Sequence, residues 1–174
     1  MKKVIAILIV FVGFSTYSFG QITASSDAYA TIVTPINLQW EVDLNFGNLA
    51  VTTVPGDVEL VPSGNIPPTR NVTGGVTLPN VIGTVTAAKF SVTGTPMYTY
   101  AITLPASCII KNNNGAGPAQ MTVDVFTSLP TPTGQLNSSG LQTLYVGATV
   151  HVLSSQAAGI YKSPTPFNVT VNYN

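Results

Sequence analysis

Hydrophobic and polar residues alternate over much of this chain, and the alternation is clearest at the C-terminal end. Within residues 167–174, Phe167, Val169, Val171 and Tyr173 share one parity, and polar residues occupy the other. Side chains alternate across a β-strand with a period of two, so the segment predicts a half-buried terminal strand. We expect the fold to require this strand and Tyr173 to be buried.

The same period recurs in short segments along the chain, and no segment shows a convincing helical period. Alternation predicts strands at 90–92, 98–104, 121–125 and 143–152, with Met121, Val123 and Val125 on one face. Further strands are expected at 28–33, 36–41, 57–61 and 69–73. The 13 prolines and 15 glycines cut the chain into short pieces. Many short alternating strands between turns predict an all-β sandwich.

The first 20 residues have the pattern of a secretory signal peptide. Two lysines precede an apolar run at 4–14, and the small residues Ser18 and Gly20 suit a cleavage site before Gln21. The run is too short to span a bilayer, which disfavours the alternative of an N-terminal anchor helix. We therefore expect a bacterial protein that is secreted or held at the cell surface, with no membrane span after cleavage.

The remaining residues, 21–174, have the length of a single domain. They carry four cations against six acids, a net charge of −2. Nucleic acid and anionic lipid both require clustered Lys and Arg, so neither is an expected partner. Only 7% of residues are charged, and the surface must be solubilised by Thr, Ser and Asn, as suits extracellular β-proteins.

Candidate nucleophiles and bases are sparse. His151 is the only histidine, and it lies on the polar parity of a predicted strand with no acid or serine partner near it in the sequence. We interpret it as an exposed strand residue rather than a catalytic base. Cys108 is the only cysteine, so no intramolecular disulfide can form, and its apolar neighbours indicate a small buried hydrophobe.

Acidic and aromatic residues give no stronger signal of a site. Asp57 and Glu59 are two apart and should face the same way on a strand, as solvated charges rather than calcium ligands. Trp40 could form a sugar-binding platform, but aromatic residues in sandwiches are more often core. We therefore predict no catalytic, metal or cofactor site, and we do not expect an enzyme.

Three segments resemble a secreted bacterial family of domains of unknown function: 43–49 with Leu-Asn-Phe-Gly, 144–149, and 158–161 with Ala-Gly-Ile-Tyr. Their order is also similar to the spore coat protein U domain of archaic chaperone–usher pilins. Those domains combine a Leu-x-Phe-Gly segment, a late Ala-Gly-x-Tyr turn and a final strand with a penultimate Tyr. The resemblance covers about the whole mature chain. It implies an immunoglobulin-like sandwich, which in pilins is completed by the N-terminal extension of the next subunit.

Residues 21–34 correspond to that extension, as an N-terminal strand or donor arm. In pilins, a residue placed like Gly159 tends to mark the turn into the last strand. The resemblance implies these assembly residues: Ile22, Ala24, Ala28, Ala30, Ile32, Gly159, Phe167, Val169, Val171 and Tyr173. The alternative is that 22–33 form the first strand of a closed sandwich. The chain departs from such pilins in one respect, because they tie their early strands with a disulfide.

Two functions remain open on this basis. The first is a secreted structural or surface-assembly subunit, fimbrial or pilin-like, that joins copies of itself or related surface subunits by β-strand addition. A periplasmic chaperone would be an additional partner of such a subunit. The second is a self-complete β-sandwich that binds glycan or protein ligands at the cell surface. They differ in whether residues 22–33 pair within their own chain.

Overall fold

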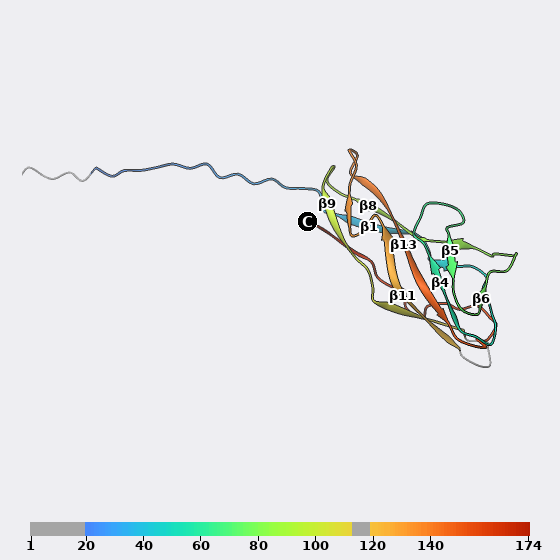
Figure 1. The fold of residues 1–174 in the computed structure, drawn as a ribbon. Coiled ribbons are helices and arrows are strands. Elements are labelled where there is room, and N and C mark those ends of the chain that lie inside the picture. Colours follow the sequence, from blue (N-terminus) through green and yellow to red (C-terminus); the bar gives the residue numbers. More distant parts are fainter. Residues whose placement is uncertain (1–19, 113–118) are drawn as a thin grey trace, which may run out of the picture. The chain divides into compact units, whose positions relative to one another are not determined.

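A computed structural model describes residues 20–112 and 119–174, and every regular element in them is a β-strand (Figure 1). The predicted signal peptide at 1–20 lies outside the described residues, apart from Gly20. Two compact units divide the chain after Ile32, and residues 33–174 hold all the strands and the hydrophobic core. The described part contains no helix that is long and apolar enough to cross a membrane. The all-β prediction is confirmed.

The larger sheet has seven antiparallel strands arranged around the long strand β13 (Leu141–Val152). On one edge β13 pairs first with β8 (Ala88–Thr93) and then with β4 (Gly56–Leu60). Its other edge pairs with β11 (Gln120–Leu129). Three outer strands extend the sheet: β1 (Asn37–Val42) beside β8, β5 (Arg70–Val72) beside β4, and β10 (Ser107–Lys111) beside β11.

Smaller strand groups complete the sandwich. The second sheet has the order β12 (Thr133–Gln135), β9 (Thr99–Thr103) and β14 (Thr170–Tyr173). Two short pairs are formed by β2 (Asn45–Phe46) with β7 (Val85–Thr86), and by β3 (Ala50–Val51) with β6 (Val76–Thr77).

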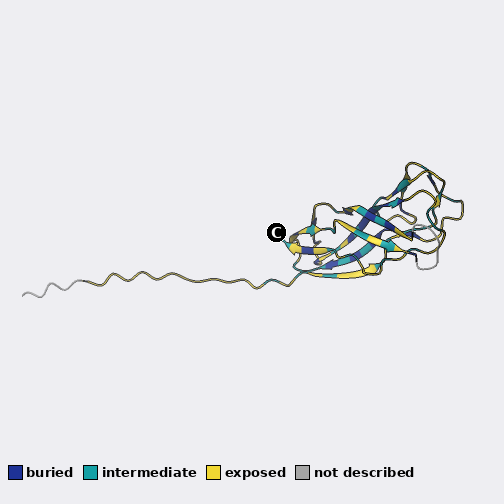
Figure 2. Ribbon diagram, turned by 90° about the horizontal axis from the view of Figure 1, so that it is seen from below, coloured by how far each residue is buried: buried dark blue, intermediate teal, exposed yellow. Residues whose placement is uncertain are grey.

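Alternation along the strands places the core between these layers, as the burial colouring shows (Figure 2). In β13 the buried residues Leu144, Val146 and Val150 alternate with partly exposed polar neighbours. Tyr100 of β9 is fully buried, and its hydroxyl donates a hydrogen bond to Oε1 of Gln142 at 2.7 Å. The buried phenol therefore keeps a polar partner, which removes most of the cost of burying it.

A β-bulge changes the parity of β11. The pairing with β13 shifts register between Asp124 and Thr127, and Val125 has a φ of 46° there. Met121 and Val123 face the core as predicted, but the prediction for Val125 is wrong, because it is 65% exposed. A bulge adds one residue to one strand, so the side chains beyond it change face.

Strand boundaries agree with the prediction in most places. The strands expected at 36–41, 57–61 and 69–73 correspond to β1, β4 and β5. The strand expected at 28–33 is wrong, since residues 20–36 form no strand. Most inward-parity side chains of that segment are small, so burying them against a sheet of the same chain would contribute little free energy.

Candidate assembly interface

The terminal segment keeps the predicted alternation, but its hydrogen-bonded part is shorter than expected. Val171 is buried, while Phe167, Val169 and Tyr173 are partly buried against the same core cluster. Ladder pairing with β9 begins only at Thr170, so the first three residues of the expected strand lack it. We expected Tyr173 to be buried. It is only partly buried, so that prediction is wrong in the extent of burial.

The Tyr173 hydroxyl joins three segments of the chain. It donates a hydrogen bond to the carbonyl oxygen of Thr34 at 2.8 Å and accepts one from the backbone N–H of Thr95 at 2.7 Å. The ring also makes an edge contact with Tyr98, with 5.5 Å between the ring centroids. The penultimate tyrosine thus ties the last strand to the segment before β1 and to the loop before β9.

We expect Tyr173→Phe to lower the free energy of unfolding by about 1–3 kcal/mol, since it leaves two backbone groups without this partner. Tyr98→Phe is the matched control, because the described residues give the Tyr98 hydroxyl no hydrogen-bond partner. Urea denaturation of both variants measures the difference. Equal losses in the two variants would contradict a structural role for the Tyr173 hydroxyl.

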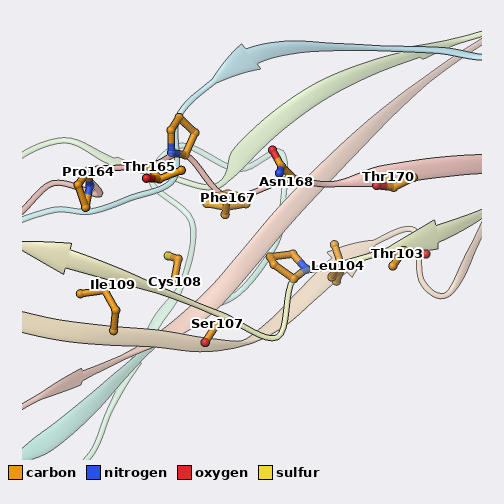
Figure 3. Close-up of a pocket in the computed structure, with 12 residues that line it drawn as sticks. Thr103, Leu104, Ser107, Cys108, Ile109, Pro164, Thr165, Phe167, Asn168 and Thr170 are labelled. Atoms are coloured by element: carbon orange, nitrogen blue, oxygen red, sulfur yellow. The ribbon is translucent and has the colours of Figure 1, made fainter.

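An open cavity of about 530 Å³ lies between β10 and residues 163–169 (Figure 3). Phe167 lines it from the terminal segment and packs on Phe126 behind it, with 5.0 Å between the ring centroids. Leu104 and Cys108 line it from the opposite side, and Figure 3 shows the Cys108 side chain pointing toward the terminal segment. Burial raises the pKa of the Cys108 thiol. This cysteine is only partly buried, whereas the sequence indicated a buried one.

Gly159 lies in the turn that leads to the terminal segment. Its φ of 150° is one that residues with a side chain rarely adopt, and a Cβ there would collide with the side chain of Asn112. Asn112 is buried, and its Nδ2 donates a hydrogen bond to the carbonyl oxygen of Ala158 at 3.1 Å. A glycine is therefore required for this turn to pack against the end of β10.

The predicted arm residues lie in the other unit of the chain. Residues 20–32 run without a strand, and their side chains are exposed, with Ile22 and Ile32 each 98% exposed. Ala24, Ala28 and Ala30 are exposed as well. Within residues 20–36 the structure assigns no strand.

A second cluster of side chains, around His151, was not predicted from the sequence. His151 on β13 lies between two carboxylates, with its Nδ1 2.7 Å from Oδ1 of Asp57 and its Nε2 2.7 Å from Oδ1 of Asp124. These partners lie 94 and 27 residues away in the sequence, on β4 and β11, so only strand pairing brings them together. His151 lies on a strand and has no acid partner near it in the sequence, as expected, but it is only partly exposed and pairs with two distant carboxylates.

The geometry of this cluster suits a clamp better than a catalytic base. A histidine that activates a nucleophile needs a ring nitrogen free to accept its proton, whereas both nitrogens of His151 face carboxylates. Hydrogen bonds to Asp57 and then to Asp124 raise the pKa of His151 by favouring the imidazolium. Asp57 and Glu59 share a face as predicted, but neither is simply solvated, since Glu59 accepts a hydrogen bond from Asn71.

We expect the stability of the sandwich to depend on pH through His151. Its pKa is raised on folding, so the imidazolium stabilises the fold fully below the unfolded pKa of about 6.5. That stabilisation is lost as the pH rises through the higher folded pKa. The melting temperature of the wild-type protein should fall across this window relative to that of His151→Gln. A difference between the two proteins that does not change with pH would contradict the clamp.

Trp40 is not in the core, contrary to expectation. It lies opposite the buried Phe90 in the β1–β8 ladder, yet it is 59% exposed. In the described part of the sheet β1 pairs only with β8 and is therefore an outer strand. The indole of Trp40 is left largely exposed to solvent there. The outer edge of β1 is therefore unpaired among the described residues, and β1 carries an exposed aromatic residue.

The Leu-Asn-Phe-Gly motif has a structural role. Asn45 and Phe46 form β2, and Gly47 has a φ of 71°, a conformation that favours glycine. Oδ1 of Asn45 accepts a hydrogen bond from the N–H of Gly47 at 2.9 Å, and Nη1 of Arg70 donates one to the carbonyl oxygen of Phe46 at 2.7 Å. The motif thus makes a tight turn that packs Phe46 against the core.

Comparison with known proteins identifies the domain but not its activity. A search of solved structures finds no match, and neither does a search of curated proteins. One family model, described as a domain of unknown function, matches residues 36–173, which run from just before β1 to the end of β14. The match starts after residues 20–32. The sandwich that carries the terminal strand, the cavity and the His151 clamp therefore belongs to the DUF4402 family.

Proposed function

We propose that this protein is a secreted structural subunit of a cell-surface assembly, fimbrial or pilin-like, whose copies associate by β-strand addition. The observation that carries the proposal is the N-terminal arm. Residues 20–32 are exposed, have no regular secondary structure and precede the family domain. An alternating segment that lacks a sheet partner is suited to pair with another subunit through its backbone.

The composition of the arm supports a donor role. Ile22, Ala28, Ala30 and Ile32 share one parity, so all would enter the same face of an acceptor. Most of that face is small, which suits insertion between packed side chains, and its two isoleucines are almost wholly exposed in the unpaired arm. Burying each of the two isoleucines contributes roughly 1.5–3 kcal/mol, which adds to the backbone hydrogen bonds that a donor strand makes with its acceptor.

Two variants that each add one carboxylate to the arm test this proposal. Ala30→Asp places a carboxylate on the inward parity and should abolish oligomers, because an unpaired charge would have to be buried. Thr31→Asp adds the same charge one residue later, on the outward parity that already carries Asp27, and should leave assembly unchanged. Light scattering coupled to size-exclusion chromatography measures the mass of each mature chain. Identical masses for the two variants and the wild type would count against strand addition.

One observation favours a second function, a surface module that binds glycans. Trp40 exposes 59% of its surface on an edge strand, and aromatic faces stack on sugar rings. If this function is correct, glycan binding will quench or shift the fluorescence of Trp40, the only tryptophan in the chain. The mature protein would then remain a monomer, and deletion of the arm would leave binding intact.

A further inference from the structure

The terminal segment lies in one long antiparallel register with β9 and the chain that follows it. β14 pairs Thr170 with Thr103, and an isolated bridge pairs Lys162 with Lys111. Eight residues back from Thr170 is Lys162, and eight residues on from Thr103 is Lys111, so the register is the same at both ends. Residues 162–173 and residues 100–111 thus lie antiparallel in one register. They are paired at both ends of this register and unpaired in its middle.

Between its two paired ends, the ladder is interrupted over residues 104–110 and 163–169, which share no strand pairing. Pro105, Pro164 and Pro166 lie in the interruption, and proline has no N–H to donate to a ladder. β10 pairs with β11 on one side, and the described chain supplies no strand to the other side of its residues 107–110. The cavity described above occupies this interruption (Figure 3).

We propose that this opening in the ladder is the acceptor site for the arm, residues 22–32, of a second copy of the chain. The inference rests on the proposed function and adds the place where the donor strand binds. Seven unpaired residues on each side span about 23 Å at 3.3 Å per residue, so about seven of the eleven arm residues would fill the opening. A strand inserted there could pair with the unpaired edge of β10, whereas Pro164 and Pro166 leave fewer N–H donors on the side of the terminal segment.

The side chains on the two surfaces are complementary. Seven of the twelve residues that line the cavity are apolar, among them Leu104, Cys108 and Phe167, and the other five are polar but uncharged. The partly filled space between these side chains suits the small inward face of the arm, which carries Ala28 and Ala30.

Charge is complementary as well. Lys111 and Lys162, both exposed, stand together where the opening ends, and they are two of the four cations of the mature chain. The only charge on the arm is the carboxylate of Asp27, on the outward parity. A bound arm would therefore keep its carboxylate in solvent, on a surface whose two lysines at the end of the opening have the opposite charge, without burying any of them.

Two residues of the chain can report where the arm binds. Cys108, the only cysteine, lines the opening, while Trp40, the only tryptophan, marks the competing edge at β1. We would compare maleimide alkylation of Cys108 in wild-type oligomers with that in Ala30→Asp, at one pH because the thiol pKa is raised. Access controls thiol reactivity, so we expect alkylation to be at least about tenfold slower in the oligomer. Thr31→Asp should behave like the wild type.

A cross-link tests the same contact directly. Ala28→Cys in the mature chain should form an intermolecular disulfide with Cys108 on mild oxidation, identified by mass spectrometry of the joined peptides. Ser25→Cys, on the outward parity, should not form it. Both products are compared under conditions in which the variants remain assembled.

The outcomes separate this inference from the proposed function. Oligomers in which Cys108 is protected and joined to position 28 support both. Oligomers in which Cys108 reacts as fast as in Ala30→Asp overturn the acceptor site but leave strand addition standing, and a blue shift of Trp40 emission would then place the arm at β1. A monomeric wild-type protein at every concentration overturns both.

Discussion

Removing residues 167–174 is expected to unfold the protein or make it insoluble. The deletion removes the buried Val171 and the partly buried Phe167 and Tyr173 from the larger core cluster, and it takes away the ladder partner of β9. Truncating one buried aromatic or aliphatic side chain costs about 2–5 kcal/mol. The whole stability of a domain is about 5–15 kcal/mol, so the combined loss should exceed it.

Circular dichroism melting of the soluble fraction measures this effect. The matched control replaces the exposed Thr170 and Asn172 with Ser, which changes the same strand on its outward face and should preserve a cooperative melt. A soluble truncated protein that melts cooperatively would contradict the requirement for the terminal strand.

Local alternation predicted much of the fold because a half-buried strand encodes its two faces in neighbouring residues. Along β13, Leu144, Val146 and Val150 follow the period of two, and the burial agrees except at Gly147, which is buried as well. The same reasoning failed at Val125, because a bulge depends on how β11 and β13 pair and leaves no local signature in this sequence.

The features of the candidate site depend on contacts between distant segments, so the sequence alone could not reveal them. His151 looked isolated because its partners Asp57 and Asp124 lie on neighbouring strands, far away in the sequence. The opening beside Cys108 likewise depends on the shared register of two segments about 60 residues apart.

Deleting residues 21–32 should abolish assembly and leave the sandwich folded. These residues contribute no strand and none of the buried core, and the family domain begins after them. The melting temperature of the shortened chain should therefore stay close to that of the Ala30→Asp monomer. If removal of the arm unfolds the protein, residues 21–32 complete their own domain and the donor role is excluded.

The central claim is that the arm joins one copy of the chain to another. Sedimentation velocity of the mature chain, residues 21–174, beside the chain lacking residues 21–32, tests it most directly. We expect oligomers for the first chain and a folded monomer for the second, across the same concentration range. A single monomeric species for both chains would contradict the claim.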